Sequence, residues 1–155
     1  MKDVAGSPGT WSSLALRVSQ FLCAGASFAA MATAHSAATN NFNSFRYLVA
    51  FLILQFFWSF GLACVDIYCL KTGADFHTLG FVVPTTIVDW VMAVLMFAVA
   101  SASAGLAVFF QRDLDYCAWT PLCGNYNLAV VLAFMTWSFI AASATSMFWL
   151  LVSFN

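Results

Sequence analysis

The sequence predicts an all-α membrane protein, a bundle of four transmembrane helices with both termini in the cytosol. Of its 155 residues, 63% are hydrophobic and only 7% are charged, whereas a soluble domain carries about 25% charged residues. A soluble chain of this length exposes too much of its surface to water to carry so large an apolar fraction. The apolar residues also gather in four long runs, which predicts four spans.

Each apolar run reaches the length of about 20 residues that crosses the hydrocarbon of a bilayer. We expect spans over about 14–34, 47–70, 79–110 and 126–154. Residues 1–13 then form a cytosolic N-terminal segment, residues 14–155 form the transmembrane domain, and outer loops cover 35–46 and 111–125. Helices are expected because an isolated strand in lipid would leave its backbone groups without hydrogen bonds.

The first span follows Ser7-Pro8-Gly9-Thr10, where a proline near the first turn favours a helix start. The residues before it lack the pattern of a cleaved signal peptide, so we expect the first run to be retained as a span. The third run is longer than the hydrocarbon requires and must tilt or project beyond it. Pro84 falls in the first turns of that run, where proline is tolerated.

The predicted orientation of the chain in the membrane rests on a small difference in the number of basic residues on its two sides. With the termini in the cytosol, Lys2, Arg17 and Lys71 flank the inner side, while Arg46 and Arg112 flank the outer side. This excess of basic residues inside is weak, but its direction is the usual one.

Two of the five cysteines, Cys117 and Cys123, lie in the second outer loop. A disulfide between them would require that this loop face an oxidising compartment, which agrees with an extracellular position. The alternative is two unpaired thiols, because spacing alone does not give the geometry of a disulfide. No CxxC pair is present, so the sequence predicts no metal site.

Several function classes are disfavoured by the sequence. The net charge of −1 and the lack of a basic cluster argue against a nucleic-acid partner. Asp113 and Asp115 in the outer loop are too close in sequence for a glycosidase pair and lack further oxygen ligands for calcium. No activated nucleophile or phosphate-binding loop is visible, so we expect neither an enzyme nor a cofactor.

Three ionisable residues fall inside predicted spans. Arg17, Asp66 and Asp89 lie on the first, second and third spans, all in the half nearer the cytosol. Buried charges in lipid are costly and pair with each other, so we expect an ion pair between Arg17 and Asp89. Asp66 either joins this pair or reaches the lipid headgroups. The pair is interpreted as a clamp between helices rather than a proton relay, because the neighbours of Asp89 in sequence are apolar and offer no wet path.

Small residues four apart let helices approach closely in lipid, where no hydrophobic force drives helices together. Ser101 with Gly105 and Gly25 with Ala29 form such pairs. Since alanine and serine are common in membrane helices, these pairs serve either the packing of the bundle or contacts between subunits.

Several segments together carry a family resemblance. They are "AGSPGTWSSLALRVSQ", "WSFGLACVDIYCL", "VDWVMA", "ASASAGLAVFFQRDLDYC" and the final "MFWLLVSFN". The chain resembles the Casparian strip membrane domain protein family of plants, and within it the CASP-like branch, subfamily 5, whose architecture is related to MARVEL proteins. The resemblance covers nearly the whole chain.

The resemblance implies a plasma-membrane protein with cytosolic termini, from a family whose founding members form stable membrane platforms and organise cell-wall modification. The family's first-span arginine and third-span aspartate match Arg17 and Asp89, and its outer-loop cysteines match Cys117 and Cys123. The first outer loop, "HSAATNNFNSF", departs from the pattern of the members that build the lignin barrier, so that role is not implied.

The function predicted is a non-enzymatic membrane scaffold that associates with itself or with related family members and is surrounded by lipid. The alternative is a small channel or transporter formed by the bundle or its oligomer. The spans lack the paired broken helices that many transporters show, which favours the scaffold.

Overall fold

A computed structural model describes residues 9–33, 43–73, 79–112, 122–153 and 155. These residues form four α-helices and no strand: α1 (Trp11–Thr33), α2 (Asn43–Thr72), α3 (Leu79–Arg112) and α4 (Leu122–Ser153). Each helix is long and apolar enough to cross a membrane. The predicted fold class, an all-α membrane protein with four spans, is confirmed, while the side on which the termini lie stays a prediction.

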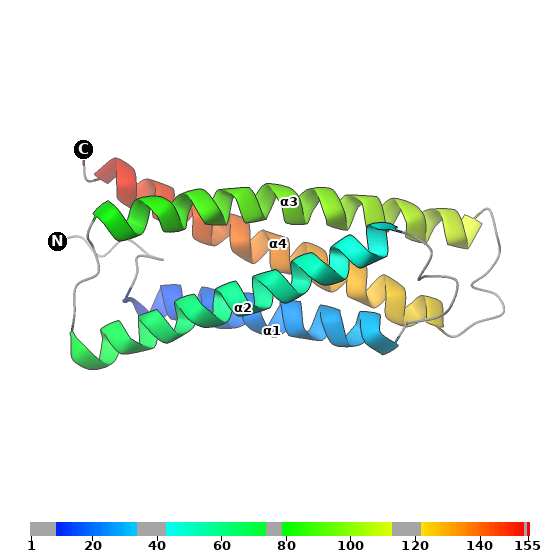
Figure 1. Ribbon diagram of the computed structural model, residues 1–155, viewed down its shortest axis with the longest axis horizontal. Coiled ribbons are helices and arrows are strands. Elements are labelled where there is room, and N and C mark those ends of the chain that lie inside the picture. The colour runs from blue at the N-terminus through cyan, green and yellow to red at the C-terminus, as the bar shows by residue number, and fades with distance from the viewer. Residues whose placement is uncertain (1–8, 34–42, 74–78, 113–121, 154) are drawn as a thin grey trace.

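The helices form an elongated bundle in which neighbours along the chain run in opposite directions (Figure 1). Helix α1 packs against α2 and α4, and α3 packs against α4 and, over a smaller interface, against α2. Helices α1 and α3 therefore lie diagonally across the bundle. The start of α1 and the end of α4 lie at the same end, as an even number of spans requires (Figure 1).

All four helices extend beyond the predicted spans at one end or at both, and for two of these ends the structure shows a local reason. Helix α1 begins at Trp11 rather than at residue 14, because the Thr10 hydroxyl accepts a hydrogen bond from the Ser13 amide at 3.3 Å and caps the helix. Helix α2 continues to Thr72. Gly73 then ends it with a φ of 63° and donates its amide to the Cys69 carbonyl at 2.9 Å.

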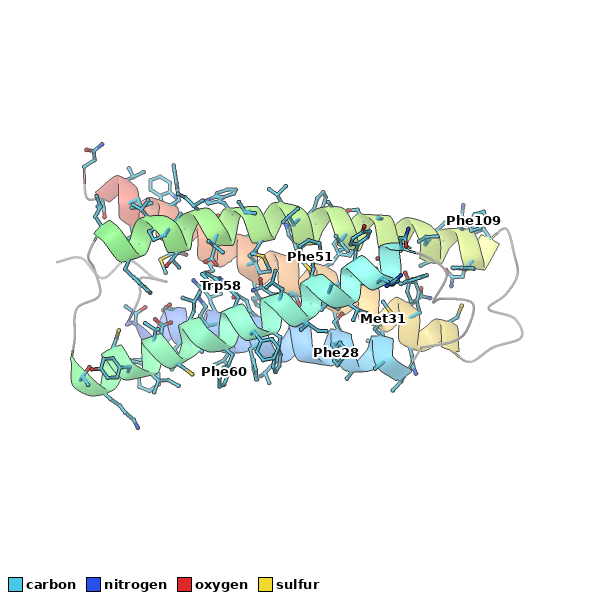
Figure 2. The ribbon with its side chains drawn as sticks, in the orientation of Figure 1. Phe28, Met31, Phe51, Trp58, Phe60 and Phe109 are labelled. Carbon is cyan, nitrogen blue, oxygen red and sulfur yellow. The ribbon has the colours of Figure 1, made fainter. Side chains whose placement is uncertain are left out.

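Many small and polar residues are buried inside the bundle, and large apolar residues cover much of its outer surface. Ala24, Ala100 and Ala133 are fully buried, whereas Phe57 and Trp149 are 65% and 62% exposed. The aromatic side chains that project from the ribbons in Figure 2 include Phe60, which is also exposed. Small inner residues allow close helix packing, and large outer residues suit contact with lipid. The interior is therefore free to hold polar groups where the four helices meet.

Helix α3 passes through Pro84 without a break near its start. The hydroxyls of the next two residues, Thr85 and Thr86, donate to the carbonyls of Phe81 and Val82 at 2.8 and 2.7 Å. These bonds satisfy the two buried hydroxyls within the helix itself. The turn that follows them carries Asp89.

Candidate functional site

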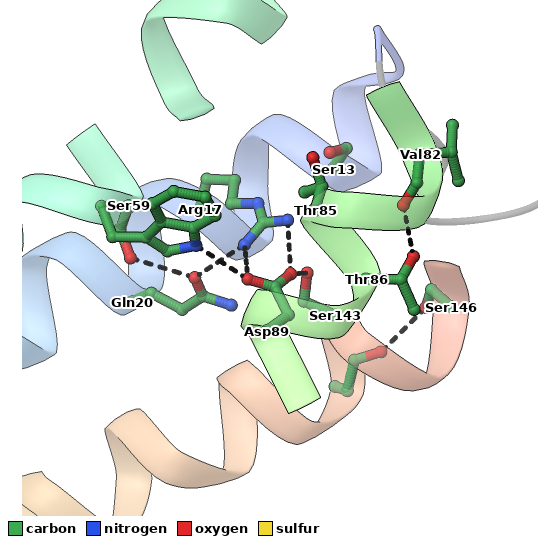
Figure 3. Close-up of polar contacts among 12 residues, drawn as sticks. Ser13, Arg17, Gln20, Ser59, Val82, Thr85, Thr86, Asp89, Ser143 and Ser146 are labelled. Atoms are coloured by element: carbon green, nitrogen blue, oxygen red, sulfur yellow. Dashed lines mark hydrogen bonds and ion pairs between the residues drawn. The ribbon is translucent and has the colours of Figure 1, made fainter. Parts of the chain in front are cut away.

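An ion pair between Arg17 on α1 and Asp89 on α3 is buried in the interior of the bundle, and Figure 3 shows its contacts. The guanidinium donates from Nη2 to Oδ2 at 2.7 Å and from Nη1 to Oδ1 at 3.2 Å. Both side chains are almost completely buried, with 1% and 0% exposed. Two parallel bonds of this kind are the strongest arrangement of a guanidinium with a carboxylate. Since α1 and α3 are diagonal, the pair joins two helices that otherwise barely touch.

The Asp89 carboxylate also binds groups from the remaining two helices. The Trp58 indole Nε1–H on α2 donates to Oδ1 at 2.9 Å, and the Ser143 hydroxyl on α4 donates to Oδ2 at 3.5 Å. Asp89 therefore receives donors from α1, α2 and α4 while it sits on α3. A buried carboxylate is tolerated when its oxygens accept several hydrogen bonds and face a positive charge, and this one does both.

The guanidinium of Arg17 begins a second set of contacts. Its Nη1 donates to Gln20 Oε1 at 3.4 Å, and the Gln20 Nε2 donates to the Phe139 carbonyl on α4 at 3.0 Å. The Ser59 hydroxyl on α2 also donates to Gln20 Oε1, at 3.1 Å, and accepts from Gln55 Nε2 at 2.7 Å. The side chains of Arg17, Gln20, Gln55 and Ser59 are all buried, and the Phe139 carbonyl accepts from Gln20, so these contacts extend the charge pair into a network across the bundle.

Asp66 does not join the ion pair. Its Oδ2 accepts from the Ser13 hydroxyl at 2.7 Å, and its Oδ1 accepts from the Gly9 amide at 3.1 Å. Among the residues described, the one ion pair found is that of Arg17 with Asp89. Asp66 thus ties the end of α2 to the start of α1, where the positive end of the helix dipole favours a carboxylate.

The four small residues expected at helix contacts separate into two groups. A Cβ at Gly25 would lie 3.3 Å from Cε2 of Phe56 on α2, so Gly25 packs within the bundle. Ala29, Ser101 and Gly105 are exposed on the outer surface, and a Cβ at Gly105 would meet no atom within 4 Å. Gly105 therefore has open space around it, and all three exposed residues face the surroundings of the bundle.

The predicted disulfide falls partly outside the residues that the structure describes. Cys123 is half-buried near the start of α4, but Cys117 belongs to the stretch 113–121, which is not described. The pairing of the two stays a prediction, and so does any role of Asp113 and Asp115, which lie in the same stretch.

Sequence reasoning missed Trp58, Ser143, Gln20, Ser59 and Gln55. A signal for part of this set was nevertheless present, because the buried positions of α1 recur every three or four residues and several of them are polar. These buried positions are Ser13, Arg17, Gln20, Ala24, Ser27 and Met31. Polar residues at that spacing in an apolar span mark the face that turns inward. Trp58 gave no such signal, since aromatic residues are frequent on both faces of α2.

The arrangement joins all four helices through polar side chains. No group of three or more histidine, cysteine or acidic residues that could hold a metal ion is found in the described part of the chain. The charged groups of the network and most of its amide groups bind each other, while the buried Gln55 Oε1 has no hydrogen-bond partner among the described residues. These contacts join the four helices at one level of the bundle.

Comparisons with known proteins agree with the resemblance. A family model for the Casparian strip membrane protein domain matches residues 6–139. The chain is 56% identical over 155 residues to CASP-like protein 5B3 from Oryza sativa subsp. indica, with 99% of each chain covered. It is 41% identical over 156 residues to CASP-like protein 5B2 from Zea mays, covering 99% of this chain and all of that one.

A third relative, CASP-like protein 5B1 from Arabidopsis thaliana, is 39% identical over 154 residues, with 98% of this chain and 100% of the relative covered. No solved structure matches the chain. These relatives extend over essentially the full length of the chain, so the similarity spans the region of all four helices.

Proposed function

Because this chain belongs to the Casparian strip membrane protein domain family, we propose that it is a non-enzymatic scaffold of the plasma membrane. In this proposal both termini face the cytosol, and copies of the protein associate with each other or with related family members. The resulting platform organises processes in the membrane or the adjacent cell wall.

The observation that carries the proposal is the position of Asp89, which accepts donors from each of the other three helices. A bundle joined in this way is a rigid unit whose inner face is already occupied by its own polar contacts. The outer face is mainly apolar and is left for lipid and for neighbouring proteins. A stable platform needs units that keep their shape while their outer surfaces make contacts.

A channel or transporter through a single bundle is less well supported. Beyond the network, large apolar side chains fill the interior, and Leu48, Leu52 and Met96 are fully buried. The polar groups of the network bind each other, so they do not line a continuous polar path along the bundle axis. A pore between subunits of an oligomer would need polar residues on the outer faces, which are mainly apolar.

Two measurements on the full chain test this proposal. The first is the number of subunits in particles purified in nanodiscs, by native mass spectrometry and by cryo-electron microscopy. We expect oligomers of defined size, whereas monomers at every concentration would contradict the scaffold. The second is ion flux into liposomes. A reproducible, ion-selective flux that Asp89→Asn abolishes would support the channel instead.

A further inference from the structure

One acceptor of the buried network lacks a donor. The amide oxygen Oε1 of Gln55 on α2 has no hydrogen-bond partner among the described residues, although the side chain is 0% exposed. The other end of the amide is bound, because Gln55 Nε2 donates to the Ser59 hydroxyl at 2.7 Å. A buried amide oxygen without a donor is costly, so a partner for Oε1 is expected.

The orientation of the Gln55 amide is set by its neighbour Ser59. A hydroxyl has one hydrogen, and Ser59 uses it to donate to Gln20 Oε1 at 3.1 Å (Figure 3). Ser59 can therefore only accept from Gln55, so Nε2 faces Ser59 and Oε1 points elsewhere. Turning the amide over would place Oε1 against Ser59 and would cost the bond from Ser59 to Gln20.

The hydrogen bonds of Gln20 show which residue of α4 lies at the level of Gln55. Gln20 binds both Ser59 on α2 and the Phe139 carbonyl on α4, so these two residues lie at one level. Gln55 comes four residues before Ser59, about 6 Å nearer the end of the bundle at which α2 begins. Thr136 comes three residues before Phe139, about 4.5 Å further in the same direction, since α2 and α4 run parallel (Figure 1).

Thr136 has a free acceptor at this level. Its side chain is 0% exposed, and its hydroxyl donates to a carbonyl of its own helix at 2.9 Å. Once its hydrogen is used, the hydroxyl oxygen can still accept through its lone pairs. Gln55 Oε1 and Thr136 Oγ1 are therefore both acceptors and cannot bind each other. A molecule that donates two hydrogens satisfies both.

The two other helices carry small residues at this level. Ala24 follows Gln20 by one turn of α1, and Ala93 follows Asp89 by one turn of α3. Both alanines are buried. Their short side chains leave more of the interior to Gln55 and to the partner of its amide oxygen than larger residues would.

We propose that one water molecule is bound between Gln55 Oε1 and Thr136 Oγ1 in the interior of the bundle, where it donates one hydrogen to each oxygen. Buried waters in proteins bind in this way to polar groups that lack other partners. The Arg17–Asp89 pair joins α1 to α3 across one diagonal of the bundle. The water joins α2 to α4 across the other diagonal.

The second buried polar atom without a partner, the hydroxyl of Ser103 on α3, supports no such site. A serine hydroxyl in a helix can turn and donate to the carbonyl four residues earlier, as the hydroxyls of Thr85 and Thr86 do. An amide oxygen has no hydrogen to donate, so Gln55 lacks this alternative.

The test uses X-ray radiolysis of the full chain in lipid nanodiscs, which splits a bound water and oxidises the side chain beside it. Mass spectrometry then locates the oxidised residues. Met96 is the reporter, because it is fully buried three residues after Ala93 and a helical side chain leans toward the N-terminal end of its helix. Met147 is the internal control, since it is 2% exposed and lies in the apolar cluster of Val82 and Leu150. We expect oxidation of Met96 and none of Met147.

Three variants connect the oxidation to the two acceptors. Gln55→Leu and Thr136→Val each remove one acceptor and should abolish the oxidation of Met96. Ser138→Ala is the matched control for Thr136→Val, because the exposed Ser138 hydroxyl also donates to a carbonyl of its own helix. This control should leave the oxidation of Met96 unchanged.

Three results would overturn the proposal. Met96 that stays unoxidised in the wild type would mean that no water is bound beside it. Equal oxidation of Met96 and Met147 would mean that water enters the whole interior. Unchanged oxidation of Met96 in Gln55→Leu or in Thr136→Val would mean that the water binds elsewhere. Melting temperatures show whether each variant keeps its fold, and if Gln55→Leu does not, Thr136→Val decides alone because valine has the shape of threonine.

Discussion

The indole of Trp58 donates to the carboxylate of Asp89 at 2.9 Å and joins α2 to α3, the pair of neighbouring helices with the smallest interface. The bond places α2 in the same network as the Arg17 ion pair on α1. Because donor and acceptor meet in the interior of a membrane bundle, where water does not compete, the bond should matter for stability.

We first predict that Trp58→Phe lowers the melting temperature of the purified protein. The change removes a hydrogen bond to a charged group while it keeps most of the ring, and such bonds contribute about 1.5–3 kcal/mol. Trp149→Phe is the matched control, because Trp149 is largely exposed on α4. Thermal unfolding in one detergent checks both variants. Equal shifts would mean that the indole hydrogen bond contributes nothing.

We next predict that Asp89→Ala gives poorly folded or misassembled protein. Removing one partner of a buried ion pair leaves the other charge without compensation and costs about 3–5 kcal/mol. The double variant Arg17→Met with Asp89→Leu should recover folded yield, because it removes both charges at once. Size-exclusion profiles after extraction measure the yield. Normal yield and size for Asp89→Ala alone would contradict the role of the pair as a clamp.

A third prediction concerns the tie between Asp66 and the start of α1. Asp66→Asn removes the negative charge and replaces one acceptor oxygen with a donor, so the bonds with the Gly9 amide and the Ser13 hydroxyl become weaker than those to the carboxylate. Hydrogen exchange of the peptide that contains Gly9 to Ser13 should become faster. Ser12→Ala is the control, since Ser12 is exposed in the same turn. If exchange is unchanged in Asp66→Asn, the two hydrogen bonds do not hold the helix start.

A fourth prediction separates packing inside the bundle from contacts outside it. Gly25→Leu should lower the melting temperature, because even a Cβ at Gly25 lies 3.3 Å from the Phe56 ring. Gly105→Leu should keep the melting temperature, since the space around Gly105 is open. Native mass spectrometry of Gly105→Leu then tests whether the face of Ser101 and Gly105 is a subunit contact. A smaller oligomer with an unchanged fold would support that contact.

A fifth prediction is that Cys117 and Cys123 form a disulfide in protein isolated without reductant. Both thiols should resist alkylation until a reductant is added, and mass spectrometry of the linked peptide measures the bond. The exposed Cys64 is the internal control, because it should react under both conditions. Full alkylation of Cys117 without reductant would rule out the pairing.

The number of spans could be read from the sequence, because hydrocarbon requires long apolar runs and the chain has four. The pairing of Arg17 with Asp89 could also be predicted from the sequence, because opposite charges buried in lipid usually form ion pairs. The remaining members of the network were not predicted. Which serine, glutamine or tryptophan reaches a given carboxylate depends on the rotation of each helix about its axis and on which helices are neighbours.

The case of Asp66 shows this limit most clearly. From the sequence, Asp66 was expected either to join the ion pair or to reach the headgroups, and it does not join the pair. Instead it accepts from the Gly9 amide and the Ser13 hydroxyl. The sequence alone determined the membrane environment, the four helices and the charges that must be buried. Only the tertiary structure decided which helices are adjacent and which lie diagonally across the bundle. In lipid, the apolar outer faces are equally well solvated in any arrangement of the helices, so the side-chain contacts inside the bundle determine which arrangement forms.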